Sequence, residues 1–131
     1  MKTLIVEDDF SSRLLLQGIL QPYGECHIAV NGREAVSAFE LALGGESPYD
    51  LVCLDIMMPE MDGQETLRRI RKLEEDKGIL MTDGVRVIMT TALDDKKNIM
   101  TAFRDQCDAY LVKPIDTRKL IEHLKSMQLI D

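Results

Sequence analysis

The sequence predicts an α/β fold in which a five-stranded parallel sheet is doubly wound, with helices on both of its faces. Short apolar runs alternate with longer segments of helical period, which is typical of consecutive βα units. No low-complexity tract, repeat or composition break marks a linker. A chain of 131 residues with 45% hydrophobic residues can form one core, so we expect a single domain over residues 1–131.

Five apolar runs have the length and composition of buried strands. They are Thr3 to Val6, Cys26 to Val30, Leu51 to Leu54, Val85 to Thr90 and Ala109 to Val112. Right-handed crossovers leave few arrangements for five such βα units, and a doubly wound sheet is the one we expect. In such a sheet the ligand binds outside the carboxyl ends of the strands, so the residues that follow each run are the candidates for function.

Helical periodicity predicts a helix after each of the first two runs. The first helix ends near Pro22, a helix breaker, and the second begins at Asn31, whose side chain suits an N-cap. The second helix ends at the glycine-rich segment 44–48. The apolar residues expected to face the sheet are Leu15, Ile19 and Leu20 in the first helix and Val36, Phe39 and Leu43 in the second.

Three further helices are predicted after acidic residues at 62, 94–95 and 116, since negative charge in the first turn suits the helix dipole. We expect residues 72–84 to lengthen the third helix or to form a surface loop, away from the edge where the strands end. The basic residues of the third helix are expected to face solvent: Arg68, Arg69, Arg71 and Lys72. The apolar residues expected to face the sheet are Leu67, Ile70, Leu73, Ile99, Ala102, Phe103, Leu120, Leu124 and Met127.

The composition excludes several classes of protein. The net charge of -7 argues against nonspecific binding to nucleic acid or to an anionic membrane. No apolar run is long enough to cross a bilayer, and the N-terminus does not resemble a signal peptide, so we expect a cytoplasmic protein. The three cysteines, Cys26, Cys53 and Cys107, are expected to be reduced core residues, because they are widely spaced within apolar stretches.

Polar residues capable of chemistry follow four of the five runs. Glu7 and Asp8 follow the first, Asp55 the third, Thr91 the fourth and Lys113 the fifth. Each residue alone is common where a strand meets solvent, but a parallel sheet brings all four strand ends to one edge. The sequence therefore predicts a site that contains carboxylates, a hydroxyl and an ammonium group.

The residue types in this site favour a hard cation and phosphoryl chemistry. Clustered carboxylates repel one another, and either a raised pKa or a bound cation relieves the repulsion. Because the ligands are oxygen atoms with no histidine or cysteine at a suitable spacing, Mg²⁺ is the expected ion. The cation and Lys113 would let an anionic phosphoryl group approach Asp55, whose carboxylate is then a credible nucleophile.

The residues around these strand ends resemble a known family. The segments Leu4 to Asp9, Leu54 to Gly63, Thr90 to Ala92 and Tyr110 to Pro114 resemble the receiver domains of bacterial two-component response regulators, the CheY-like class. The resemblance extends from Lys2 to about Met127. It implies a flavodoxin-like (βα)5 sheet with the strand order 2-1-3-4-5 and a cis peptide bond before Pro114.

The resemblance also implies a role for each site residue. Asp55 would be the phosphoacceptor, Lys113 the cation that binds the phosphoryl group, Thr91 the switch hydroxyl and Tyr110 an aromatic ring that rotates. Asp9 would be a bystander or a helix cap. The implied metal ligands are Glu7, Asp8, Asp55 and the main-chain carbonyl of Met57.

The function implied is that of a phosphorylation-dependent switch that catalyses only its own phosphoryl transfer. A sensor histidine kinase or phosphotransfer protein would be the donor, and the face of the fourth helix, fifth strand and fifth helix would control a partner protein. Neither nucleic acid nor membrane would be bound directly, and a stand-alone regulator is the simplest expectation. Because Met57 and Leu93 are apolar where a polar side chain could orient water, we expect a long-lived acyl phosphate.

Three alternatives come from other classes of protein. A receiver-like module could bind a partner without being phosphorylated, although such domains usually lack part of the acidic site. A dehalogenase-like phosphatase would need a second aspartate two residues after Asp55, where Met57 stands. A flavin or dinucleotide binder would need a phosphate-cradling glycine-rich loop in place of residues 7–9.

Overall fold

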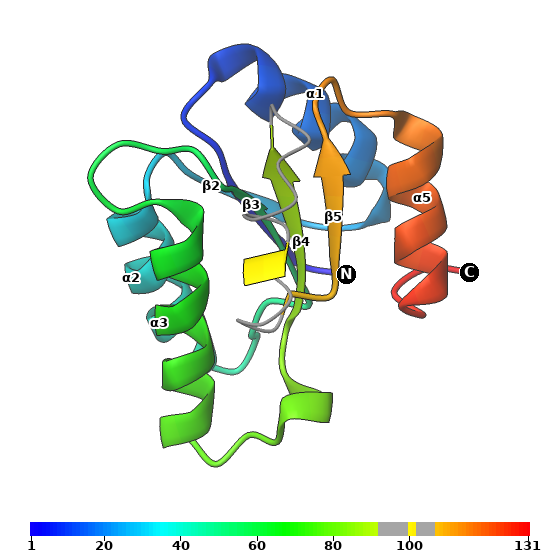
Figure 1. The fold of residues 1–131 in the computed structure, drawn as a ribbon. Coiled ribbons are helices and arrows are strands. Elements are labelled where there is room, and N and C mark those ends of the chain that lie inside the picture. The colour runs from blue at the N-terminus through cyan, green and yellow to red at the C-terminus, as the bar shows by residue number, and fades with distance from the viewer. Residues whose placement is uncertain (92–99, 102–106) are drawn as a thin grey trace.

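The computed structural model describes residues 1–91, 100–101 and 107–131 (Figure 1). Five strands form one sheet: β1 (Thr3–Val6), β2 (Cys26–Ala29), β3 (Leu51–Asp55), β4 (Arg86–Thr91) and β5 (Ala109–Val112). Their order is β2-β1-β3-β4-β5, and every neighbouring pair is parallel. The predicted doubly wound fold and its strand order are therefore confirmed.

The described helices cover both faces of this sheet. They are α1 (Phe10–Leu20), α2 (Gly32–Leu43), α3 (Gly63–Asp76) and α5 (Thr117–Ser126). Helices α2 and α3 lie on one face and α1 and α5 on the other (Figure 1). The predicted fourth helix, with Ile99, Ala102 and Phe103, and Leu93 before it lie outside the described residues.

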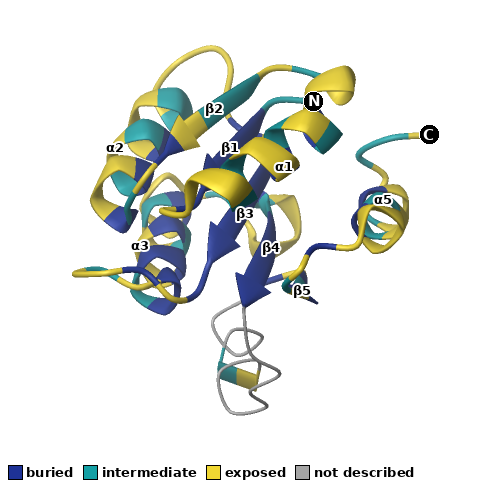
Figure 2. Ribbon diagram, turned by 90° about the horizontal axis from the view of Figure 1, so that it is seen from above, coloured by how far each residue is buried: buried dark blue, intermediate teal, exposed yellow. Residues whose placement is uncertain are grey.

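Each face of the sheet has its own hydrophobic core, because successive side chains of a strand point to opposite faces. Leu54 and Met89 pack under α2 and α3, whereas Cys53, Ile88 and Leu111 pack under α1 and α5. The strands at the centre of the sheet are buried on both faces, and the outer sides of the helices are exposed (Figure 2). The alternation of side chains along a strand therefore shows on which face of the sheet each residue at its carboxyl end lies.

Side chains that accept hydrogen bonds fix where the helices begin. Asn31 accepts a hydrogen bond from the main chain of Glu34, as predicted, and Asp62 and Asp116 cap α3 and α5 in the same way. Helix α3 ends at Asp76, and a surface loop with a short 3-10 helix, η2 (Met81–Asp83), leads to β4. The long connection predicted for residues 72–84 is thus divided between the helix and a loop.

Several predicted details were wrong by one position. In α1 the buried residues are Leu16 and Leu20, while Leu15 is 43% exposed, because the helix turns the neighbouring position toward solvent. In α2 Ala35 takes the fully buried place predicted for Val36. Strand β4 begins and ends one residue later than predicted, so Thr91 lies inside it.

The prediction that Arg71 faces solvent was also wrong. Its guanidinium lies 2.7 Å from the buried Glu74 carboxylate and donates a hydrogen bond of 2.8 Å to the Val85 carbonyl. Glu74 accepts a 2.6 Å hydrogen bond from the Val85 main chain, and Asp108, 3.3 Å from Arg71, accepts one from Val87. These polar contacts join α3 to the beginnings of β4 and β5.

We predict that Arg71→Met lowers the free energy of unfolding by about 3 kcal/mol, because it leaves the buried Glu74 carboxylate without its cation. Arg69→Met is the matched control, since Arg69 pairs with Glu65 on the exposed side of α3 and should cost no more than about 0.5 kcal/mol. Urea unfolding measures both. Equal losses in the two variants would contradict the role assigned to Arg71.

Candidate functional site

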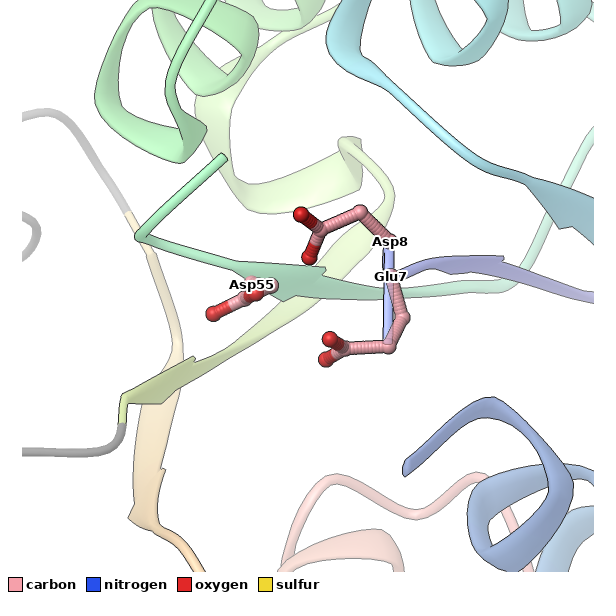
Figure 3. A group of neighbouring side chains, drawn as sticks. All are labelled: Glu7, Asp8 and Asp55. Atoms are coloured by element: carbon pink, nitrogen blue, oxygen red, sulfur yellow. The ribbon is translucent and has the colours of Figure 1, made fainter. Parts of the chain in front are cut away.

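Three carboxylates gather at the carboxyl edge of the sheet. Glu7 and Asp8 follow β1, and Asp55 is the last residue of β3 (Figure 3). One oxygen of each lies within 4.8 Å of the others. Glu7 and Asp55 are buried, while Asp8 is exposed. The structure thus brings together the acidic residues that the sequence placed at two separate strand ends.

Main-chain hydrogen bonds that continue the parallel pairing hold this edge in place. The Glu7 amide donates to the Ala29 carbonyl at 3.1 Å, and the Ile56 amide to Thr90 at 2.9 Å. The Lys113 amide donates to the Thr91 carbonyl at 2.6 Å. Each strand end is therefore fixed by its neighbour, which positions the side chains of the site.

Asp9 is excluded from the cluster by its role as a helix cap. Its carboxylate accepts a 2.9 Å hydrogen bond from the Ser12 amide at the start of α1. This hydrogen bond holds the pKa of Asp9 below its ordinary value. The structure confirms Asp9 as a cap and separates it from its neighbours Glu7 and Asp8.

Lys113 brings a positive charge to the two buried carboxylates. Its Nζ atom lies 2.8 Å from Glu7 Oε2 and 3.5 Å from Asp55 Oδ2. The peptide bond between Lys113 and Pro114 is cis, as the resemblance implied. The lysine predicted at this edge therefore contacts the acidic residues directly.

The environment of Asp55 disfavours its charged form. Burial and the neighbouring Glu7 raise the pKa of Asp55 to about 7, against the opposing effects of Lys113 and of the Met57 amide. The Met57 amide donates to Asp55 Oδ1 at 3.3 Å. Burial alone would lower the pKa of Lys113, but the close ion pair with Glu7 and the negative charge of Asp55 raise it overall. Lys113 thus stays charged and only partly relieves the repulsion.

The donor set fits a hard divalent cation. Three carboxylates at close quarters, with excess negative charge that one ammonium does not cancel, match the oxygen ligands that Mg²⁺ prefers. Met57 is 61% exposed, and its main-chain amide lies beside Asp55 through the hydrogen bond described above. Its carbonyl as a fourth ligand stays a prediction.

Thr91 and Tyr110 share one face of the sheet. Thr91 is buried at the end of β4, two residues after Met89, and Met89 is paired with Tyr110 on β5. Alternation along the strands places both residues on the face covered by α2 and α3, and the Tyr110 side chain packs against that core. The two predicted switch residues are therefore on the same side of β4 and β5.

Thr90 was missed as a site residue in the sequence. It pairs with Asp55 on β3 and points to the opposite face from Thr91. Its side chain is buried, and its hydroxyl has no hydrogen-bond partner among the residues that the structure describes. Counting strand alternation from the apolar Met89 could have revealed that the two threonines serve different faces.

The doubly wound α/β fold, with an acidic cluster and a lysine at the carboxyl edge of its sheet, defines the class of protein. Comparison with known proteins identifies the family within this class. The profile of the response regulator receiver domain matches residues 3–125. The chain belongs to this family, whose general function is that of a phosphorylation switch in two-component systems. Among the part of the chain that the structure describes, no helix is long and apolar enough to span a membrane.

The relatives support this assignment. The transcriptional regulatory protein SrrA of Staphylococcus aureus is 34% identical over 125 residues, which cover 95% of this chain and 46% of SrrA. The chain thus spans about half the length of the curated relatives it matches. The receiver domain of the histidine kinase CKI1 from Arabidopsis thaliana, complexed with Mg²⁺ and BeF₃⁻, is 27% identical with a TM-score of 0.83, covering 97% of this chain and 89% of that one.

A second solved structure contains a partner protein. The complex of CheX and CheY with BeF₃⁻ and Mg²⁺ from Borrelia burgdorferi matches with a TM-score of 0.82 and 27% identity. The match covers 98% of this chain and 89% of that one. These likenesses agree with the fold described above.

We predict that Asp55→Asn stabilises the metal-free protein in a pH-dependent way. The folded carboxyl titrates at about 7 and the unfolded one near its ordinary value of 3.8, so the folded state binds the extra proton between these values. Wild-type stability therefore falls as the pH rises through this interval, whereas asparagine has no charge to bury.

Thermal unfolding in EDTA measures the difference between the two proteins. The melting temperatures should be close at about pH 4, and the variant should be higher by on the order of 5 °C at about pH 8. Asp9→Asn, which keeps a capping side chain, is the control and should show no such gain. An advantage of Asp55→Asn that shrinks as the pH rises would contradict the prediction.

Proposed function

We propose that Asp55 accepts a phosphoryl group from a phosphohistidine of a sensor histidine kinase or phosphotransfer protein. The observation that carries this proposal is the position of the Asp55 carboxylate, buried beside Glu7 and within 3.5 Å of the Lys113 ammonium. An Asp55 oxygen attacks phosphorus, and the bond from phosphorus to the histidine nitrogen breaks, leaving its electron pair on the imidazole. The product is an acyl phosphate.

Glu7, Asp8, Asp55 and the carbonyl of Met57 would hold Mg²⁺ in this proposal. When bound, the ion supplies positive charge that offsets the repulsion between the incoming phosphoryl oxygens and the carboxylates. Lys113 contributes a second positive charge and binds a phosphoryl oxygen. The chain itself provides positioning and electrostatics, with no separate general base.

The proposed response begins at Thr91 and ends at a partner surface. The Thr91 hydroxyl donates to a phosphoryl oxygen, and the Tyr110 ring turns toward the space that Thr91 leaves. This changes the face formed by β5, α5 and the segment between β4 and β5, which controls a target protein. One or two hydrogen bonds supply less than the roughly 5.5 kcal/mol that a complete switch requires, so partner binding completes the shift.

We predict that the wild-type protein, incubated with MgCl₂ and acetyl phosphate, gains the mass of one phosphoryl group. Asp55→Asn should gain none, because an amide cannot form the acyl phosphate. Asp9→Asn is the matched acidic control and should gain the group as the wild type does. Mass spectrometry of the intact protein measures all three.

A wild type that gains no phosphoryl group would favour the other candidate, a receiver-like module that binds its partner without phosphorylation. Phosphorylated Asp55→Asn would show instead that another residue is the acceptor. Both outcomes are read directly from the masses.

We predict that Met57→Asn speeds the loss of phosphate from Asp55 by about tenfold, because an amide beside the acyl phosphate can orient the attacking water. The exposed Met57 side chain leaves room for the change. Met57→Leu, which stays apolar, is the control and should keep the slow rate. Loss is followed by mass after the phosphodonor is removed, and an unchanged or slower rate in Met57→Asn would refute the assignment.

A further inference from the structure

Thr90 has a buried polar group that no described contact explains. The residue is 1% exposed, and its hydroxyl oxygen has no hydrogen-bond partner in the part of the chain that the structure describes. A buried hydroxyl without a partner costs stability, which a valine of the same shape would avoid. A hydrogen bond to this hydroxyl would offset the cost of its burial.

The strand register places Thr90 in the floor of the candidate site. Thr90 pairs with Asp55 on one side and with Leu111 on the other. Its neighbour Ile88, two residues earlier, belongs to the core under α1 and α5, as do Cys53 and Leu111. Alternation thus puts the side chains of Thr90 and Asp55 next to each other on the same face.

The Lys113 side chain must pass over this position. Lys113 follows β5, yet its ammonium reaches Glu7 after β1 and Asp55 on β3. In the sheet order, β4 lies between β5 and β3. The lysine therefore crosses β4 on the face where Thr90 carries its hydroxyl.

Lys113 uses the oxygens that a cation would need. Its ammonium is 2.8 Å from Glu7 Oε2, and both Glu7 and Asp55 belong to the group of carboxylates that can hold a metal. A Mg²⁺ ion held by Glu7 and Asp55 would compete with Lys113 for these carboxylates, and Lys113 would then lose its contact with Glu7 Oε2. Because the Lys113 side chain is only 18% exposed, an ammonium that loses one acceptor is stabilised by another one nearby.

We propose that the Thr90 hydroxyl is this second acceptor. Thr90 is a positioning residue: its oxygen accepts a hydrogen bond from Lys113 Nζ while the cluster holds Mg²⁺ and Asp55 is unphosphorylated. Because the hydroxyl is neutral, it does not hold the ammonium back from the phosphoryl group as a carboxylate would. It also does not compete with the carboxylates for the cation. The inference rests on the proposed function, since it assumes a Mg²⁺ site at Glu7, Asp8 and Asp55.

The test is a titration of the metal-free full chain with MgCl₂, without phosphodonor, followed by NMR of the main-chain amides. Thr90→Val should weaken Mg²⁺ binding by about fivefold, the usual effect of one hydrogen bond. Thr90→Ser, which restores a hydroxyl, should recover most of the affinity. Thr3→Val is the matched control: Thr3 is buried and its hydroxyl also has no hydrogen-bond partner among the described residues. It should leave the affinity unchanged, because Thr3 begins β1 and so lies at the end of the strand away from Glu7.

A double-mutant cycle shows whether the hydroxyl acts through Lys113. In a Lys113→Met background, Thr90→Val should have no further effect on Mg²⁺ affinity. A fivefold loss that persists in this background would overturn the inference, since the hydroxyl would then act on the carboxylates directly. Equal affinities of Thr90→Val and wild type would overturn it as well.

The outcomes also separate this inference from the proposed function. A wild type that does not bind Mg²⁺ refutes the proposed metal site, and the inference falls with it. A wild type that binds Mg²⁺ and gains a phosphoryl group, while Thr90→Val binds equally well, refutes the inference alone.

Discussion

The repulsion among carboxylates at the carboxyl edge is the constraint on which the rest of the site depends. Two buried acids, Glu7 and Asp55, lie with Asp8 in one cluster, and the ammonium of Lys113 faces the two buried acids. That ammonium comes from β5, so the balance of charge spans most of the sheet. The fold makes this possible because parallel pairing sets all the strand ends at the same level.

The two ends of the sheet treat charge in opposite ways. At the amino ends of β4 and β5, Arg71, Glu74 and Asp108 pair with one another and with main-chain groups, so each charge has a partner. At the carboxyl ends, the negative charge exceeds the positive charge among the described residues, and burial together with Glu7 raises the pKa of Asp55. Paired charges stabilise the fold at the amino ends of the strands. At the carboxyl ends, the excess negative charge favours binding of a cation, which in turn allows an anion to bind.

Local pattern predicted most of the fold, and tertiary context decided the rest. The strands were predictable because a sheet buried on both faces needs continuous apolar runs, and Asp55 was predictable because it ends one of them. The inward turn of Arg71 was not, since it depends on Glu74 and on a loop that brings Val85 beside α3. The role of Thr90 depends on its pairing with Asp55 on a neighbouring strand. A short stretch of sequence does not specify such a pairing.

Thr90 and Thr91 are adjacent in sequence and face opposite sides of one strand. In the proposals above, the first belongs to the charge chemistry under α1 and α5, and the second to the aromatic switch on the side of α2 and α3. Two adjacent residues of one strand thus separate the groups that contact the lysine from the groups that change conformation. An engineered sensor could carry its optical label on the Tyr110 side of β5, on the face of the sheet opposite Asp55 and Thr90.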